Sequence, residues 1–196
     1  MSLPTIYLLR HGQTEWNVEG RYQGQLNSPL TAKGKEQAKE NALKLKKYIN
    51  LKEVKFFASP LGRAKKTAEI IAKESGLDVS EIIFDDNIQE FNYGIFEGQT
   101  KVYCKSELAT AFLAREADKF NYVLEGGESY AKVYVRLKAW LRCVKDESVI
   151  VVVAHEMINR ALRGIYCDLS NEEMLHLRQA NDILIKLENH KESILE

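Results

Sequence analysis

Two apolar runs in this chain each end abruptly at a histidine. Near the start, Ile6-Tyr7-Leu8-Leu9 leads into Arg10-His11-Gly12, and late in the chain Val149 to Ala154 leads into His155. Short apolar runs bounded by polar residues are typical of buried strands. In open α/β sheets, ligands bind at the carboxyl ends of the strands. The two histidines therefore predict one site built from both ends of the chain.

The rest of the chain alternates between strand-like and helix-like segments. Strands are predicted at 4–10, 54–58, 82–84, 149–154 and 182–188, with irregular segments at 12–29 and 85–98. Helices are predicted at 31–48 with Thr31 as N-cap, from Ser59-Pro60 (N-cap and first turn) to Gly76, and at 102–120, 129–145, 157–167 and 171–176. This alternation favours an α/β fold, a three-layer sandwich with a mostly parallel central sheet flanked by helices. The pattern leaves the direction of the edge strands open.

Composition limits the partners and the setting that we expect. The 196 residues fit a single domain, 1–196. The 28 Lys and Arg residues balance 28 Asp and Glu, so no global field favours nucleic acid or a membrane, and an anion site has to be built locally. The three cysteines are far apart and show no metal-ligand spacing, which fits a reducing, cytoplasmic setting. No apolar stretch is long enough to cross a bilayer, and no signal-peptide pattern opens the chain.

Several strand-end residues suit the binding of phosphate. Arg10 and Arg63 each follow a predicted strand, and a guanidinium can hold two phosphate oxygens at once. Asn17 and Gln23, in the loop after the first strand, add neutral donors. A neutral His11 has the lone pair needed to attack phosphorus. These residues suit the binding of a phosphate group, and because no set of metal ligands accompanies them, we expect no metal ion and no cofactor.

One motif fragment suggests zinc, but its pattern is incomplete. His155-Glu156 opens like the zinc motif HExxH, whose second histidine belongs at position 159. Position 159 is Asn, so we reject a zinc site there. The remaining histidines, His176 and His190, have no motif around them and are predicted to lie on the surface.

Six ordered blocks of residues resemble the signature of the histidine phosphatase superfamily, the phosphoglycerate-mutase-like fold. They cover the chain from residue 4 to about 165. The blocks are Arg10 to Asn17; Gly24 with Ser28 to Thr31, Gly34 and Gln37-Ala38; Ser59 to Ala64 with Thr67-Ala68; Glu90 to Gly98; Gly127 to Ser129; and Val153 to His155. The resemblance implies one domain with a helical cap around 99–128.

The resemblance also implies a reaction. It is that of a metal-independent, histidine acid-type phosphatase, which hydrolyses a small phosphorylated metabolite through a phosphohistidine on His11. His155 then faces His11 and donates to the transferring group. Glu90 protonates the leaving alkoxide and afterwards deprotonates the incoming water. Glu97 and Glu128 remain open as alternatives for this acid.

Two departures from the family pattern bear on the substrate. Position 156 is Glu where relatives most often have Gly, and a carboxylate beside bound phosphate is repulsive unless it is paired or points away. Its backbone N–H still suits a phosphate. Sixty-five positions separate Glu90 from His155, a stretch that is markedly longer in cofactor-dependent mutases. The shorter stretch favours water as the acceptor, and therefore a phosphatase.

Several alternatives stay open at this stage. A phosphoglycerate mutase uses the same cage of residues, and a non-catalytic phospho-ligand-binding protein could keep the fold. Many relatives are dimers, which leaves a homodimer open. The cap residues that we expect to select the substrate are Lys101, Tyr103, Lys105, Arg115 and Tyr122.

Overall fold

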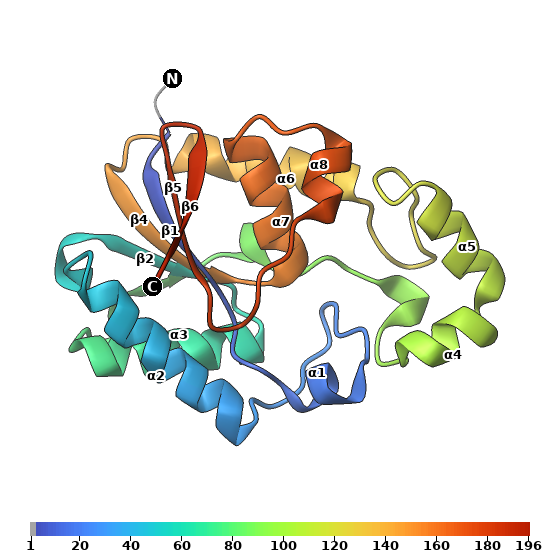
Figure 1. Cartoon of the computed structure of the whole chain (residues 1–196), viewed down its shortest axis with the longest axis horizontal. Helices are drawn as coiled ribbons and strands as arrows, with labels where there is room; N and C mark the ends of the chain where they lie inside the picture. Colours follow the sequence, from blue (N-terminus) through green and yellow to red (C-terminus); the bar gives the residue numbers. More distant parts are fainter. Residues whose placement is uncertain (1–2) are drawn as a thin grey trace.

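The computed structural model describes residues 3–196, in which six strands form one sheet of order β3-β2-β4-β1-β5-β6 (Figure 1). The strands are β1 (Thr5–Arg10), β2 (Lys55–Ala58), β3 (Ile82–Phe84), β4 (Val149–Ala154), β5 (Leu184–Glu188) and β6 (Lys191–Leu195). Strands β3, β2, β4 and β1 run parallel, whereas β5 is antiparallel to β1, and β6 to β5. The predicted α/β sandwich with a mostly parallel sheet is confirmed, and the antiparallel strands lie on one side of it.

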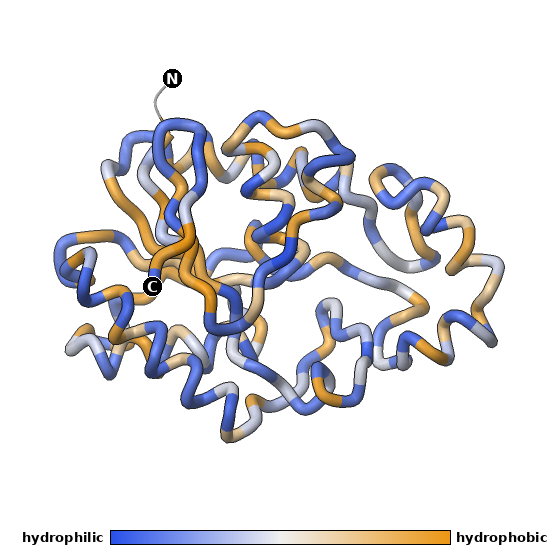
Figure 2. The backbone as a smooth tube through the Cα atoms, viewed as in Figure 1, coloured by the Kyte–Doolittle hydropathy of each residue, from blue (hydrophilic) through white to orange (hydrophobic). Residues whose placement is uncertain are grey.

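Helices cover both faces of the sheet (Figure 1). They are α1 (Glu15–Glu19), α2 (Ala32–Lys46), α3 (Gly62–Ser75), α4 (Lys101–Ser106), α5 (Ala109–Ala117), α6 (Tyr130–Cys143), α7 (Glu156–Tyr166) and α8 (Asn171–His176). Successive residues of a strand face opposite sides, so Leu8 packs with α6 and α7 whereas Leu9 packs with α2 and α3. The strands consequently form a continuous hydrophobic centre (Figure 2). No helix among residues 3–196 is long and apolar enough to span a membrane.

The pairing of β1 with β4 brings the two predicted histidines together. The strands run in parallel register, with Arg10 opposite Ala154. The N–H of His11 donates to the carbonyl of Ala154 at 3.0 Å, which extends the ladder one residue beyond the strands. Both strands therefore end at the same level, and His11 and His155 leave the sheet side by side.

The start of α3 differs from the prediction. Thr31 caps α2 as expected, accepting from the N–H of Gly34 at 3.0 Å, but Ser59 does not cap α3. That helix begins at Gly62 after Leu61, two residues later than predicted. Ser59 instead continues the end of β2, where its N–H donates to the carbonyl of Val153 at 3.0 Å. Its hydroxyl contacts His155 Nε2 at 2.8 Å, so the side chain belongs to the site.

Helix α1 and strand β6 were not predicted. The first-loop helix α1 shows no apolar periodicity; a capping box between Thr14 and Asn17 stabilises it instead. Strand β6 follows a two-residue turn in which Asn189 and His190 have φ of 50° and 58°. Such turns usually carry Asn-Gly, and β6 is mostly exposed, so neither turn chemistry nor hydrophobicity indicated a hairpin.

The segment 99–128 projects from one end of the sheet (Figure 1). It holds two short helices, α4 and α5, where one helix over 102–120 was predicted. The break falls at Leu108, which has non-helical φ and ψ and packs against the main core. That the chain forms one domain over 1–196 stays a prediction, and residues 1 and 2 lie outside the described part.

The loop after β1 crosses the start of α2 at very close range. A Cβ at Gly12 would lie 2.1 Å from the carbonyl oxygen of Gly34, and a Cβ at Gly34 would lie 2.0 Å from the carbonyl oxygen of Gln13. Both distances are far inside van der Waals contact. Only glycines allow these two backbones to approach, and the approach fixes the segment that carries His11.

We predict that Gly34→Ala destabilises the protein by about 1–3 kcal/mol, although alanine normally strengthens a helix relative to glycine. The added methyl group collides with backbone that cannot move without displacing the loop after His11. Urea denaturation monitored by circular dichroism measures the change. Lys35→Ala, at an exposed position of the same helix, is the control and should change stability by less than about 0.5 kcal/mol. A stabilised Gly34→Ala variant would contradict the tight crossing.

Candidate active site

A pocket of about 290 Å³ opens at the carboxyl ends of the central strands. Seven of the eight predicted site residues line it: Arg10, His11, Asn17, Gln23, Arg63, Glu90 and Glu156. The eighth, His155, is fully buried behind them. The structure therefore brings all the predicted site residues into one region, from β1, the first loop, α3, the 85–98 loop and the start of α7.

One ring nitrogen of His11 is fixed by the backbone. His11 Nδ1 lies 2.8 Å from the carbonyl oxygen of Gly12. A carbonyl oxygen only accepts, so Nδ1 carries the proton and donates. In the neutral ring the lone pair is then on Nε2. Because His11 lines the pocket, this nitrogen is the one available to attack a phosphorus atom.

The second histidine lies against the first. The ring centroids of His11 and His155 are 5.2 Å apart, and His155 Nε2 is 2.8 Å from Ser59 Oγ. His155 Nδ1 is buried and has no hydrogen-bond partner among residues 3–196. Burial, together with the positive charge of Arg63, lowers the pKa of both rings well below the usual value. Both rings are therefore neutral near pH 7.

The two arginines are anchored by backbone carbonyls. Arg63 is almost fully buried and donates to the carbonyls of Gly24 at 2.6 Å and Leu26 at 2.7 Å. Arg10 Nη1 donates to the carbonyl of Gln179 at 2.9 Å. In each side chain Nε is buried without a partner in the described part of the chain. Fixed guanidinium groups with unused donors are suited to an anion such as phosphate.

Glu90 is the carboxyl group of the pocket that lies deepest. It is buried, and Oε1 accepts from the N–H of Phe91 at 2.8 Å. Burial raises the pKa of Glu90 to about 7, against the opposing effect of Arg63. A carboxyl group with this pKa exists in both protonation states near neutral pH, as a proton donor and acceptor requires.

The two alternative acids are engaged elsewhere. Glu128 accepts from the guanidinium of Arg136 at 2.9 Å and from the N–H of Asn92 at 2.9 Å. Glu97 accepts from two backbone N–H groups, those of Gln25 and Tyr93. Neither side chain lines the pocket. The geometry thus favours Glu90.

The neutral donors of the first loop also reach the pocket. Asn17 Oδ1 accepts from the N–H of Thr14 at 3.1 Å, which holds the side chain while leaving its NH₂ group for a ligand. Gln23 is buried and lines the pocket, where its NH₂ group can donate. Both amides can therefore add hydrogen bonds to a phosphate without adding charge.

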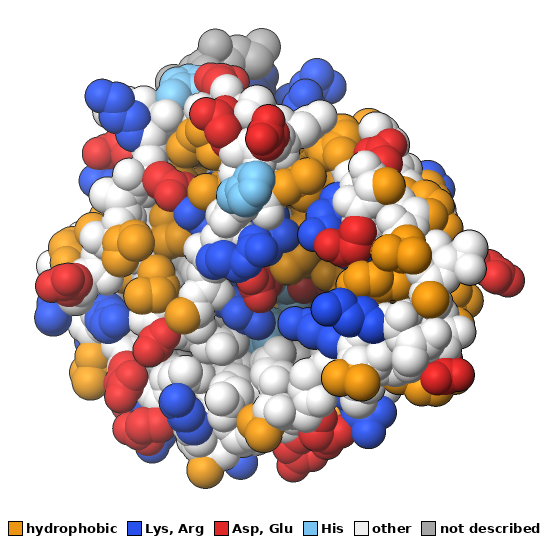
Figure 3. Space-filling model, turned by 45° about the vertical axis from the view of Figure 1, so that its right-hand side comes forward, with side chains coloured by type: hydrophobic (Ala, Val, Ile, Leu, Met, Phe, Trp, Pro, Cys, Tyr) orange, Lys and Arg blue, Asp and Glu red, His pale blue; other side chains and the backbone are white. Residues whose placement is uncertain are grey.

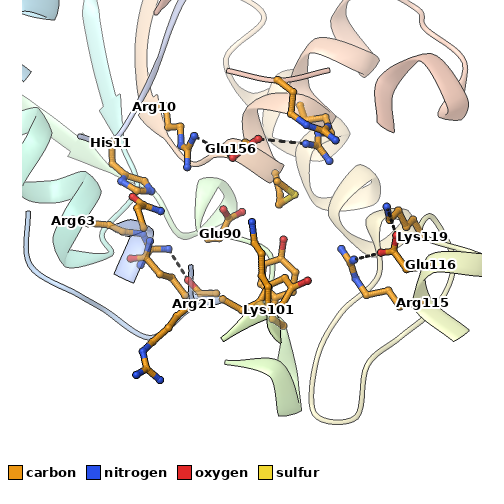
Figure 4. A pocket seen from close by; sticks show the side chains of 18 residues that line it. Arg10, His11, Arg21, Arg63, Glu90, Lys101, Arg115, Glu116, Lys119 and Glu156 are labelled. Atoms are coloured by element: carbon orange, nitrogen blue, oxygen red, sulfur yellow. Dashed lines mark hydrogen bonds and ion pairs between the residues drawn. The ribbon is translucent and has the colours of Figure 1, made fainter. Parts of the chain in front are cut away.

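Glu156, which stands where the family pattern most often has Gly, lies close to two arginines. Its Oε2 lies 3.1 Å from Arg10 Nη1, and its Oε1 lies 3.4 Å from Arg160 Nη2 (Figure 4). The carboxylate is thus paired with two arginines, one of which, Arg10, also suits the binding of phosphate.

A polar network behind β1 was not predicted. Buried Gln179 donates to the carbonyl of Leu8 at 3.1 Å and accepts from Asn159 Nδ2 at 2.8 Å, and Asn159 donates to the carbonyl of Leu9 at 3.0 Å. Asn181 donates to the carbonyl of His11. These amides hold the backbone that carries Arg10 and His11. No motif or periodicity in 177–183 indicated this role.

The cap contributes cations to the opposite wall of the pocket. Of the five expected cap residues, Lys101 and Arg115 line it, whereas Tyr103, Lys105 and Tyr122 do not. The predictions missed further cations in the lining, namely Arg21, Lys119, Arg160 and Arg178. Lysine and arginine side chains consequently border the hollow from both sides (Figure 3). Among residues 3–196, no group of three or more His, Cys, Asp or Glu is arranged to hold a metal ion.

Comparison with known families gives a match over nearly the whole chain. A profile of the histidine phosphatase superfamily (branch 1) matches residues 6–194. Over 90% of the chain, the sequence is 36% identical to a probable 2-carboxy-D-arabinitol-1-phosphatase of Arabidopsis thaliana. It spans only 36% of the length of that relative. It is 31% identical to phosphoserine phosphatase 1 of Hydrogenobacter thermophilus, covering 93% of this chain and 90% of that protein.

A third relative matches more strongly over a shorter range. It is a probable phosphoglycerate mutase of Escherichia coli, 49% identical over 92 residues, which are 47% of this chain and 40% of that protein.

Solved structures show the same fold. A putative alpha-ribazole-5'-P phosphatase from Escherichia coli superposes with a TM-score of 0.83 over 98% of this chain and 94% of that one, at 23% identity. A mycobacterial glucosyl-3-phosphoglycerate phosphatase superposes with a TM-score of 0.78 over 93% and 90% of the two chains, at 29% identity.

The raised pKa of Glu90 predicts a pH-dependent effect on stability. The folded state holds the proton more tightly than the unfolded chain, so ionisation of Glu90 destabilises the fold as pH rises from about 4.5 through about 7. Glu90→Gln removes this cost. We expect its free energy of unfolding, relative to the parent, to improve by up to roughly 3 kcal/mol between pH 4.5 and pH 8.

Denaturant titrations at the two pH values measure this effect. Glu107→Gln, at an exposed position after α4, is the matched control. Its free energy of unfolding should differ from that of the parent by the same amount at both pH values. The assignment of a raised pKa to Glu90 fails if the stability difference between Glu90→Gln and the parent is the same at both pH values.

Proposed function

Because the chain belongs to branch 1 of the histidine phosphatase superfamily, we propose that it is a metal-independent phosphomonoesterase acting on a small phosphorylated metabolite. The observation that carries the proposal is the state of His11. A neutral ring, fixed through Nδ1 by the Gly12 carbonyl, presents Nε2 to a pocket that also holds two arginines and a titratable carboxyl group. This is the arrangement that phosphoryl transfer to nitrogen requires.

In the first step, His11 Nε2 attacks the phosphorus atom of the ester. The P–N bond forms as the bond from phosphorus to the ester oxygen breaks, and protonated Glu90 gives its proton to the departing alkoxide. Arg10 and Arg63 balance the charge on the three other phosphoryl oxygens. His155 lies beside His11 and donates a hydrogen bond to the transferring group.

In the second step, water attacks the phosphohistidine. Glu90, now a carboxylate, takes a proton from the water as the new P–O bond forms. The P–N bond breaks, and its electron pair returns to His11 Nε2. Inorganic phosphate is left in the same cage of arginines. With a pKa of about 7, Glu90 changes protonation state at little free-energy cost between the two steps.

A phosphoglycerate mutase is the second candidate. The Escherichia coli relative that shares 49% identity over 92 residues favours it, and a mutase uses the same nucleophile and cage. The phosphatases match 90% or more of this chain, and the short stretch from Glu90 to His155 favours water as the acceptor. Isomerisation of 3-phosphoglycerate in the presence of bisphosphoglycerate separates the two: a mutase converts it, whereas a phosphatase releases inorganic phosphate.

We predict that His11→Ala lowers turnover of phosphomonoesters by roughly 10³-fold or more, because the cage offers no other nucleophile at that position. Turnover of the parent should persist in excess EDTA. A rapid quench without acid should trap labelled phosphoenzyme in the parent that is stable to base and labile to acid. His176→Ala, at an exposed position, is the control. Label that survives acid, or that appears in His11→Ala, assigns the covalent step elsewhere.

We further predict that Glu90→Gln lowers kcat/KM for alkyl phosphates by ~10²–10⁴-fold but hardly affects aryl phosphates with good leaving groups. A general acid matters most when the departing oxygen is basic. For the same reason, kcat/KM of the parent for alkyl phosphates should fall above about pH 7, as Glu90 loses its proton. A series of leaving groups tests both points, with Glu128→Gln as the matched control. Equal losses across the series would transfer the role to another residue.

A further inference from the structure

One carboxylate lies directly on a phosphate-binding arginine. Glu156 is the first residue of α7 and lines the pocket. Its Oε2 lies 3.1 Å from Arg10 Nη1, and its Oε1 lies 3.4 Å from Arg160 Nη2, so one side chain spans two guanidinium groups (Figure 4). We call Arg10 and Arg63, which bind the phosphoryl oxygens in the proposed function, the phosphate cage. Of the two arginines that Glu156 contacts, only Arg10 belongs to it.

The other pocket carboxyl groups do not share this position. Glu90 is buried and titrates with a pKa of about 7. Glu116 lies on the cap, 3.4 Å from Arg115 Nη1 and 2.8 Å from Lys119 Nζ. Among the carboxyl groups that line the pocket in the described chain, Glu156 alone forms an ion pair with an arginine of the cage.

We propose that Glu156 competes with phosphate for Arg10 and thereby speeds the release of inorganic phosphate. This inference rests on the proposed function. A phosphate dianion that accepts from Arg10 lies across the same guanidinium from the Glu156 carboxylate. Because both groups are negatively charged and share one guanidinium, each weakens the interaction of the other with Arg10.

Arg160 gives the displaced carboxylate a second partner. It is nearly buried, and its Nη1 is held by the hydroxyl of Tyr130 at 3.1 Å. Since Glu156 already reaches Arg160, binding of phosphate can shift the carboxylate from Arg10 to Arg160 without leaving it unpaired. Departure of phosphate then restores the pair with Arg10. The exchange lowers the affinity of the cage for phosphate while leaving the cage intact.

If Glu156 has a purely structural role, the affinity for phosphate should change in the opposite direction when its charge is removed. If the carboxylate only held Arg10 in place, removing it would loosen the cage and weaken phosphate binding. Arg10 has another anchor, because its Nη1 donates to the Gln179 carbonyl at 2.9 Å. The sign of the change in phosphate affinity therefore distinguishes competition from support.

The test uses Glu156→Gln, which keeps the size of the side chain and removes its charge. Calorimetric titration with inorganic phosphate at pH 8 should give a Kd about 10-fold lower than that of the parent, or lower still. Both kcat and KM should fall while kcat/KM is kept or raised, because product leaves more slowly. Glu192→Gln, which removes the charge from a remote pair with Arg163, should leave the Kd unchanged.

An unchanged or higher Kd in Glu156→Gln overturns the competition. Glu156→Ala provides the same measurement if the glutamine variant does not fold. If the parent itself binds no phosphate and hydrolyses no phosphomonoester, the proposed function fails as well. If the parent does both and the variant matches it, only the role of Glu156 is refuted.

Discussion

The parallel pairing of β1 with β4 is the constraint on which the site depends. It places Arg10 opposite Ala154, and the next residue of each strand is a histidine. Residues 144 positions apart in the sequence thereby bring their rings to a centroid distance of 5.2 Å. A shift of one residue in register would turn the side chains of one strand to the other face of the sheet and separate the rings. The hydrophobic packing on both faces of the sheet fixes that register.

Burial then determines the protonation states of the ionisable residues in the pocket. The same exclusion of water lowers the pKa of His11 and His155 and raises that of Glu90 to about 7. A neutral His11 and a protonated Glu90 can therefore exist together near neutral pH, beside the guanidinium groups of Arg10 and Arg63. Backbone carbonyls hold those arginines, so no carboxylate inside the cage is needed to keep Arg63 in place. The positive charge of these arginines can therefore stabilise an anion that binds in the pocket.

The sequence predicted these parts to different extents. Strands β1 and β4, and the residues that end them, follow from local hydrophobicity and are where they were expected. Ser59 was interpreted as a helix cap, because its contact with His155 depends on two strands distant in sequence being adjacent in the sheet. The amides of Gln179 and Asn181 act through long-range hydrogen bonds that leave no periodic pattern. Local patterns thus located the two strand-end histidines, whereas the groups that support them depend on tertiary contacts.

The cap is coupled to the acid by direct packing. The Arg115 guanidinium lies 5.4 Å from the ring of Tyr93 and 5.9 Å from that of Phe91, and it is nearly buried. Phe91 is also the residue whose N–H holds Glu90. Arg115 of the cap therefore packs on the segment that holds the Glu90 carboxyl group. Since the chain as a whole is neutral, the positive charge at the pocket comes from this local cluster of cations rather than from a global field.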